Sequence, residues 1–235
     1  MAGAVRIGGE PARKPGQMVT GHEEFSVDSG PEYVSRGGVK LANALDAFGL
    51  DVEGRQALDV GASTGGFTDV LLQRGAASVV ALDVAYGELH WRLRQDPRVT
   101  VLERTNARSL EPEALPYRPN LIVADVSFIS LKKVLPAVLA AAAPRFDCLA
   151  MVKPQFEAGR GAVGAGGVVR EPQHRADAVR RVADAAWALG LGVRGVTASS
   201  LPGPAGNVEY FLWLTRQAAP LENAGLDRAI AEGPQ

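Results

Sequence analysis

The chain has 235 residues, of which 46% are hydrophobic, and its formal net charge is −1. This length and apolar content are typical of one α/β domain with a small appendage. The longest apolar stretches are far shorter than a bilayer span, and the N-terminus lacks a signal-peptide pattern, so we expect a cytoplasmic protein with no membrane partner. The charge balance is not that of a general nucleic-acid binder, so any RNA contact must come from local basic patches.

The chain has one cysteine and three histidines. One cysteine excludes an internal disulfide, and this set of residues is too small for an ordinary zinc site, so we expect no metal. Cys148 lies in an apolar run, which indicates a buried small hydrophobic residue.

Residues 1–30 differ from the rest of the chain. Val5 begins a strand-like run that ends in a turn at Gly8-Gly9, and a second short strand is predicted over Glu24 to Val27. A fragment of this size cannot hold a core alone, so it is either a frayed extension or part of a larger module. The next residues, 31–35, are interpreted as a linker.

A helix is predicted from Val39 to Phe48, because its apolar residues recur at helical spacing and Gly49 can end it. Lys40 lies in the first turn of this helix. A lysine is slightly disfavoured there by the helix dipole, so its role is worth testing.

Strands and helices alternate along the rest of the chain. We predict strands near residues 56–60, 78–83, 99–103, 120–125, 147–153, 192–199 and 208–215. We predict helices near residues 66–74, 89–94, 130–142 and 171–189. This alternation is typical of a doubly wound α/β domain. The turn residues 203–207 indicate a final hairpin with an antiparallel last strand, and the segment from 218 is a polar tail.

A glycine-rich turn, Gly61 to Gly66, lies between the first of these strands and the first of these helices. Backbone N–H groups and a helix N-terminus at such a turn form a nucleotide pocket in an open parallel sheet. The turn reads G-A-S-T-G-G and does not match the dinucleotide fingerprint. Asp83 ends the second strand and is placed to bind ribose hydroxyls.

Charged residues also end two other strands, Asp125 after the fourth and Lys153 after the fifth. Strand ends of an open sheet converge on one crevice, so these charges should meet. Lys40 and Glu209 complete a set of two lysines and two acids, which suits proton removal from a weakly acidic hydroxyl. Each of these residues alone could equally be half of a surface ion pair.

Five glycines lie between Gly159 and Gly167. This segment is either a surface loop or a mobile lid over the pocket, with Arg160 and Arg170 available to phosphates.

Several motifs, in this order, resemble the TlyA family, also called hemolysin A, which carries an FtsJ-like methyltransferase domain. They are Tyr33-Val34-Ser35-Arg36-Gly37-Gly38-Val39-Lys40-Leu41, Asp59 to Thr68, Ala124 to Ser130, Val152 to Glu157 and Asn207 to Tyr210. The resemblance implies a Rossmann-like class I fold, with a mostly parallel seven-stranded sheet, an antiparallel last strand and a small β fragment in front.

The resemblance also implies a function: methylation of ribose 2′-hydroxyls of ribosomal RNA, at cytidines within ribosomal subunits, with S-adenosyl-L-methionine as the donor. The family's catalytic tetrad falls on Lys40, Asp125, Lys153 and Glu209. Lys153 would be the base, Lys40 would position the ribose, and the two acids would orient the lysines. The implied cofactor residues are Gly61, Ala62, Ser63, Thr64, Gly65, Gly66, Asp83 on the ribose, Asn106 near the adenine and Asp125 near the sulfonium. Asn106 could also be an ordinary loop residue with no contact to the cofactor.

Full-length members begin with an S4-like RNA-binding module, and Val5 to Val27 resembles only its last part. We therefore divide the chain into a partial S4-like module (1–30), a linker (31–35), the FtsJ-like domain (36–217) and a polar tail (218–235). RNA contacts are expected at Arg6, Lys14, Arg36, Arg160 and Arg170, no DNA partner is expected, and the oligomeric state is left open.

Three alternatives remain at this point. A nicotinamide-dependent dehydrogenase shares the glycine turn and Asp83. A membrane-active protein is suggested by the hemolysin name, although no stretch has a basic amphipathic face suited to a bilayer. A relative that binds the cofactor but has lost RNA is suggested by the short N-terminal part.

Overall fold

The computed structural model describes residues 5–12, 14, 16–27 and 32–233. Two separate sheets form within these residues. The first sheet is small and antiparallel, in the order β2-β1-β3. Its strands are β1 (Val5–Ile7), β2 (Glu10–Pro11) and β3 (Phe25–Val27). Phe25 is 58% exposed, in keeping with the expectation that this fragment has no core of its own.

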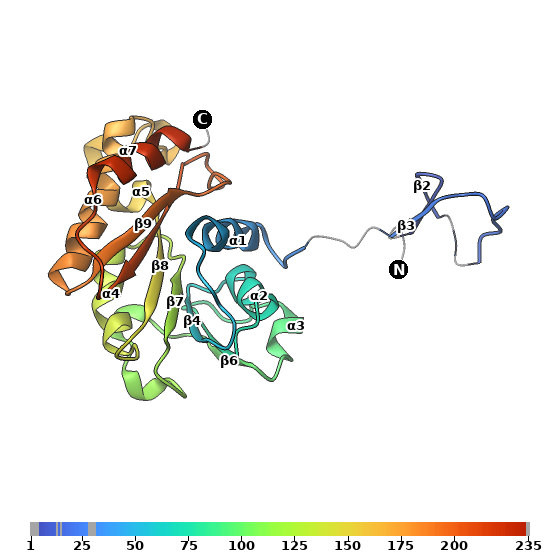
Figure 1. Ribbon diagram of the computed structural model, residues 1–235, viewed down its shortest axis with the longest axis horizontal. Helices are drawn as coiled ribbons and strands as arrows, with labels where there is room; N and C mark the ends of the chain where they lie inside the picture. The colour runs from blue at the N-terminus through green and yellow to red at the C-terminus, as the bar shows by residue number, and fades with distance from the viewer. Residues whose placement is uncertain (1–4, 13, 15, 28–31, 234–235) are drawn as a thin grey trace.

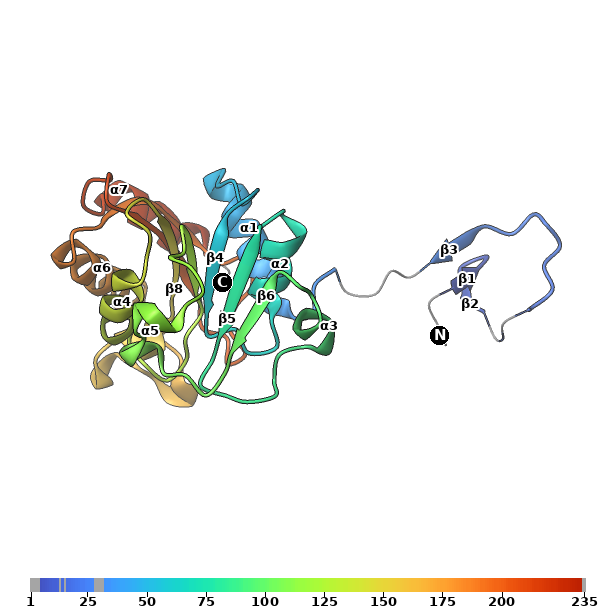
Figure 2. The ribbon, with the colours of Figure 1, turned by 90° about the horizontal axis from the view of Figure 1, so that it is seen from below.

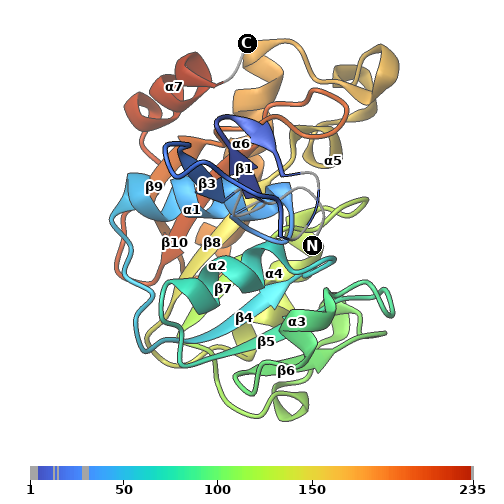
Figure 3. The same cartoon turned by 90° about the vertical axis from the view of Figure 1, so that its right-hand side faces the viewer.

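The second sheet has seven strands in the order β6-β5-β4-β7-β8-β10-β9 (Figure 3). They are β4 (Gln56–Val60), β5 (Ser78–Leu82), β6 (Val99–Leu102), β7 (Leu121–Ala124), β8 (Asp147–Val152), β9 (Gly192–Ala198) and β10 (Tyr210–Thr215). Neighbouring strands from β6 to β8 are parallel, and β10 is antiparallel to both β8 and β9. The predicted sheet, with its antiparallel last strand, is confirmed.

Helices cover both faces of this sheet (Figures 1 and 2). They are α1 (Arg36–Phe48), α2 (Gly66–Gln73), α3 (Trp91–Arg94), α4 (Leu131–Ala140), α5 (Pro154–Glu157), α6 (Pro172–Ala188) and α7 (Asn223–Glu232). Side chains of the strands alternate between the two faces: Leu58 and Val60 pack with α4 and α6, whereas Ala57 packs with α1 and α2. Each face therefore has its own apolar core.

Helix α1 ends as predicted at Gly49, which adopts a left-handed conformation with φ of 61°. Its buried side includes Leu41, Ala44 and Leu45. Lys40 precedes Ala44 by one helical turn, so it lies on this same buried side rather than in solvent.

The segment after residue 217, predicted as a polar tail that is helix-prone at best, contains the helix α7 at Asn223–Glu232. Leu226 and Ala229 are buried, and α7 packs against β9 and α6. The segment before the helix also runs along the sheet edge, where Val193 N donates to Ala219 O at 2.8 Å. Two apolar residues three positions apart are enough to attach a helix whose average composition is polar.

Candidate functional site

A cavity of about 460 Å³ lies at the carboxyl ends of the parallel strands. It is lined by all four predicted catalytic residues and by most of the glycine turn. These residues are Lys40, Asp125, Lys153, Glu209, Gly61, Ala62, Ser63, Thr64 and Gly66. Of the strand-end charges that were expected to meet in one crevice, Asp125 and Lys153 both line this cavity, whereas Asp83 does not.

The first lysine–carboxylate pair joins α1 to the start of β10. Lys40 Nζ lies 2.5 Å from Glu209 Oε2, although the residues are 169 positions apart in the sequence. The two residues are 8% and 1% exposed. Because both charges are removed from water, each depends on the other for its stability in this position.

The second pair joins the ends of the adjacent strands β7 and β8. Lys153 Nζ lies 2.5 Å from Asp125 Oδ1, and it donates a hydrogen bond to Ser127 Oγ at 2.8 Å. Asp125 Oδ1 accepts no hydrogen bond of regular geometry, so its contact with the amine is an ion pair while the hydrogen bond goes to Ser127. Ser127 was not predicted, because a local hydroxyl contact leaves no pattern in the sequence.

Close contact between α1 and α2 brings Lys40 over the glycine turn. A Cβ atom on Gly66 would lie 2.2 Å from Ser35 Oγ and 2.8 Å from Gly38 N. The first turn of α2 therefore needs glycine so that the start of α1 can pack against it.

The glycine turn itself packs against the end of β7. Gly61 has φ of 87°, and a Cβ atom there would lie 2.4 Å from Asp125 O. Asp83 holds the turn from the other side: its Oδ2 accepts from Ser63 N and its Oδ1 from Ala85 N, both at 2.8 Å. Each carboxylate oxygen keeps a lone pair for a ribose hydroxyl.

Three predicted cofactor residues do not line the cavity: Asp83, Gly65 and Asn106. A Cβ on Gly65 would face the side chains of Leu93 and Leu89, so this residue serves the packing of α2 on α3. Asn106 Oδ1 caps a short 3₁₀ turn by accepting from Arg108 N at 3.0 Å. Asn106 still follows Thr105, whose N–H donates to Asp83 O, so it lies close to the end of β5.

The predicted RNA-binding residues are spread over the molecule. Arg36 lines the cavity, whereas Arg6 and Lys14 belong to the small N-terminal β fragment. Arg170 donates to Ala165 O at 3.4 Å and does not line the cavity. The Arg160 side chain lies outside the described part of the structure.

The glycine-rich segment forms two short 3₁₀ turns, at residues 160–162 and 165–167. Asn207 ties it to the β9–β10 loop, since its Nδ2 donates to Gly167 O and its Oδ1 accepts from Val169 N, both at 2.9 Å. These two hydrogen bonds attach the glycine-rich segment to Asn207. A lid formed by this segment stays a prediction.

Asp59 is a buried acid beneath the site. Its Oδ2 accepts from Thr68 Oγ1 at 2.7 Å, and its Oδ1 has no hydrogen-bond partner. Burial raises the pKa of Asp59 to about 7, and the nearby charges of Asp125 and Asp83 contribute in the same direction. Asp59 was not singled out from the sequence, although an acid inside an otherwise apolar strand was the available signal.

Phe128 is a second residue that the sequence did not single out. It is 91% exposed, its φ is 62°, and its ring centroid lies 5.2 Å from that of Phe156. A non-glycine residue in this region of φ is strained, and such strain concentrates at functional sites. Phe128 directly follows Ser127, which lines the cavity.

Within the described residues, no helix has the length and apolar character to cross a membrane. Over the same part of the chain, no group of three or more His, Cys, Asp or Glu side chains is arranged to hold a metal ion.

Comparison with known proteins places this site in a family. Residues 33–216 match the FtsJ-like methyltransferase family. The 16S/23S rRNA (cytidine-2′-O)-methyltransferase TlyA of Mycobacterium tuberculosis is 58% identical over 99% of this chain and 90% of its own length. The chain belongs to the TlyA family of FtsJ-like methyltransferases.

Two further TlyA-family comparisons agree. The 23S rRNA (cytidine-2′-O)-methyltransferase TlyA of Campylobacter jejuni is 35% identical over 77% of this chain and 70% of its own. A solved structure from Streptococcus thermophilus, described as a hemolysin candidate, has a TM-score of 0.82 and 39% identity, covering 98% of this chain and 86% of that one. TlyA-family membership confirms the predicted family and the predicted donor, S-adenosyl-L-methionine, and it excludes the dehydrogenase alternative.

Proposed function

We propose that this TlyA-family chain methylates ribose 2′-hydroxyls of cytidines in ribosomal RNA, within ribosomal subunits in the cytoplasm. The names of the M. tuberculosis and C. jejuni relatives support the substrate. The observation that carries the proposal is the arrangement of two lysine–carboxylate pairs in one cavity beside the glycine turn.

The residues of the cavity fit the donor. Gly61 to Thr64 line the cavity with the backbone of the glycine turn. Asp83 lies outside the lining but holds the turn through Ser63 N, and it is the proposed acceptor for ribose hydroxyls. Asn106, also outside the lining, is the proposed contact to the adenine. A volume of about 460 Å³ lies within the usual range for a site of this kind. When bound, S-adenosylmethionine supplies a methyl group on a positively charged sulfur, which the ribose oxygen attacks.

The chain's own residues then position the hydroxyl and take its proton. Lys153 Nζ is the proposed acceptor of the 2′-hydroxyl proton, and its contacts with Asp125 and Ser127 fix its direction. Lys40, fixed by Glu209, donates to the ribose. Most of the rate gain comes from positioning, because both lysines are held before the substrate arrives.

RNA contacts around the cavity come from three parts of the chain. Arg36 lies at the cavity and suits a phosphate, and the exposed ring of Phe128 suits stacking against a base. Arg6 and Lys14 on the N-terminal β fragment, which we assign to a partial S4-like module, extend the contact. Arg160 and Arg170 act on a lid formed by the glycine-rich segment.

The test is transfer of labelled methyl from S-adenosylmethionine to ribosomal subunits from an unmodified strain. Lys153→Ala should lose the label by at least about a hundredfold, as expected for loss of a general base, while cofactor binding measured by calorimetry is retained. Lys133→Ala, at an exposed lysine of α4, is the matched control and should keep full transfer. Label that persists in Lys153→Ala, or that appears on a base rather than on ribose, would refute the proposal.

A further inference from the structure

A second cavity, of about 370 Å³, lies at the opposite end of the large sheet. It is lined by four arginines from segments distant in sequence: Arg55 just before β4, Arg145 just before β8, Arg194 in β9 and Arg216 just after β10. Lys153 and this end of β8 are separated by six strand residues, or about 20 Å. The arginine cavity is therefore separate from the catalytic one.

The arginine cavity carries an excess of positive charge. Asp147 is the one carboxylate among its lining residues, and both of its oxygens are engaged. Oδ2 lies 2.5 Å from Arg55 Nη2, and Oδ1 accepts from Trp213 Nε1 at 2.8 Å. No ion pair joins Arg145, Arg194 or Arg216 to an acid in the part of the chain that the structure describes.

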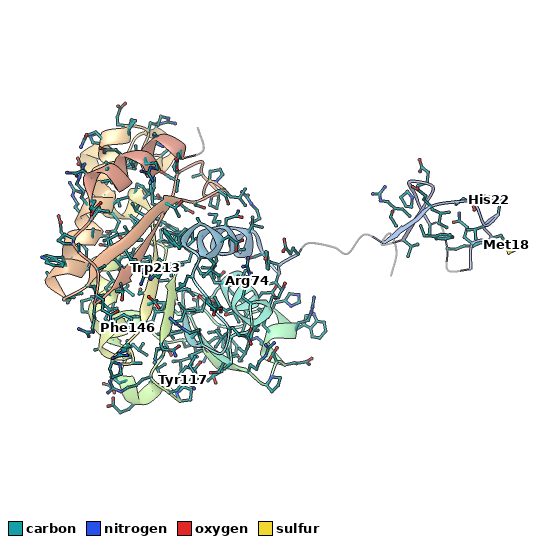
Figure 4. The ribbon with its side chains drawn as sticks, in the orientation of Figure 1. Met18, His22, Arg74, Tyr117, Phe146 and Trp213 are labelled. Atoms are coloured by element: carbon teal, nitrogen blue, oxygen red, sulfur yellow. The ribbon has the colours of Figure 1, made fainter. Side chains whose placement is uncertain are left out.

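Aromatic rings hold two of these guanidinium groups in place. Arg194 Cζ lies 4.6 Å from the centroid of Trp213, and Arg216 Cζ lies 5.6 Å from that of Phe146. Figure 4 labels both rings on the part of the domain that contains β8 and β10. Stacking occupies the face of a guanidinium and leaves its N–H edge free, so these donors are pre-organised for a ligand.

Arg55 adds an unsatisfied donor. Its Nη2 donates to Asn120 O and contacts Asp147, but its Nε is buried and has no hydrogen-bond partner. A buried donor without a partner is uncommon in a folded protein and calls for an explanation such as an absent ligand.

We propose that the arginine cavity binds phosphate groups. Planar guanidinium forks match phosphate oxygens bidentately, and three guanidinium groups without acids suit a ligand with more than one negative charge. The ligand is either the phosphodiester backbone of RNA or a free phosphate compound. This site lies outside the methyl-transfer chemistry, and it stands whether or not the proposed function holds.

Inorganic pyrophosphate is the probe, titrated into the full chain by calorimetry in chloride buffer. Arg194→Gln/Arg216→Gln should weaken its binding at least tenfold. The control, Arg118→Gln/Arg228→Gln, makes the same charge change at exposed arginines elsewhere and should bind as the wild type does. The inference is wrong if wild type and the Arg194/Arg216 variant bind pyrophosphate equally, or if the control loses binding to the same extent.

A second variant distinguishes a loss of the phosphate site from a loss of the fold. Arg194→Lys/Arg216→Lys keeps the charge but loses the planar fork, and it should fall between wild type and the glutamine variant in affinity. Both variants should bind S-adenosylmethionine as tightly as the wild type. If the lysine variant binds pyrophosphate as weakly as the glutamine variant while its fold and cofactor binding are intact, geometry rather than charge dominates and the phosphate site still holds.

Binding to ribosomal subunits distinguishes the two sources of phosphate. If RNA backbone occupies the cavity, the glutamine variant binds subunits more weakly and the slope of log K against log salt falls by about 2, since two phosphate contacts are lost. If a free phosphate compound occupies it, subunit binding is unchanged while pyrophosphate binding is lost.

Discussion

Each lysine of the catalytic cavity is held by a carboxylate from a different element. Lys40 and Glu209 are almost completely buried, whereas Lys153 and Asp125 keep side-chain exposures of 12% and 24%. The Lys40–Glu209 pair therefore fixes the contact between α1 and the start of β10 more firmly. The Lys153–Asp125 pair keeps the access to solvent that a proton acceptor needs. This difference supports the division of roles between Lys40 as the positioning residue and Lys153 as the base.

Glu209→Gln should destabilise the protein, because it leaves the Lys40 ammonium buried without a counter-charge. The expected loss in free energy of unfolding is about 3–5 kcal/mol, measured by urea denaturation. Lys40→Met/Glu209→Gln removes both charges and should recover most of that stability without recovering methyl transfer. Equal stability of Glu209→Gln and wild type would contradict the importance of this pair.

Asp59 makes stability depend on pH. Its pKa is about 7 in the folded protein against 3.8 for an ordinary aspartate, so the folded state retains a proton that the unfolded state loses. The stability of the folded state should therefore fall as pH rises from about 4 to 7, by an amount on the order of 4 kcal/mol, and stay level above.

Asp59→Asn removes this titration and keeps an acceptor for Thr68 Oγ1. The variant should be more stable than wild type at pH 8, and its unfolding free energy should lack the fall between pH 4 and 7. Asp227→Asn, at an exposed position, controls for the change in net charge. Parallel stability–pH curves for wild type and Asp59→Asn would show that Asp59 is not protonated in the folded state.

At the scale of elements, the contact between the first turns of α1 and α2 determines where Lys40 lies relative to the glycine turn. Gly66 permits this contact, and Tyr33 packs so closely on Gly38 that a Cβ there would lie 2.4 Å from Tyr33 Cβ. Both glycines are therefore required for close packing: Gly66 where α2 meets the start of α1, and Gly38 where α1 meets Tyr33.

Gly66→Ala should push α1 away from α2. The expected cost is about 1–3 kcal/mol in stability, as for other overpacked contacts, with a larger loss in methyl transfer because Lys40 moves with its helix. Gly225→Ala in α7 is the control, since a Cβ there would make only an ordinary contact, 3.5 Å from Val196 Cγ1. Wild-type activity in Gly66→Ala would mean that the position of α1 is not critical.

Much of this arrangement could be predicted from the sequence. Because parallel strands end at one edge, the positions of Asp125 and Lys153 after apolar runs were enough to place them together. Ser127 and Asp59 were missed because neither breaks a periodic pattern. The packing of α7 on β9 and α6 was not predicted, because only Leu226 and Ala229 anchor this polar helix. The arginine cavity could not be predicted because the order of strands in the sheet was unknown.

At the scale of the whole molecule, positive charge is placed at several distant sites on a chain whose net charge is −1. Arg36 lines the catalytic cavity, and four arginines line the arginine cavity at the opposite end of the sheet. Arg6 and Lys14 belong to the N-terminal β fragment. This distribution suits a large, folded RNA surface better than a single short strand.

Arg6→Gln/Lys14→Gln should therefore weaken binding to ribosomal subunits and lower the salt slope by up to about 2. Cofactor binding should be unchanged, because neither residue lines the catalytic cavity. The Arg118→Gln/Arg228→Gln variant again provides the control for charge. If the variant binds subunits as tightly as the wild type at several salt concentrations, the N-terminal β fragment does not contact the RNA.

The position of β10 has a consequence for how the protein is made. This strand follows β9 in the chain but inserts between β8 and β9, and Glu209 immediately precedes it. A nascent chain that has emerged from the ribosome only as far as β9 lacks both Glu209 and β10. Lys40 then has no carboxylate partner, and β8 has no strand on the side that β10 will occupy. The Lys40–Glu209 pair therefore forms late in translation, and under the proposed mechanism an incomplete chain cannot methylate the ribosome that is still synthesising it.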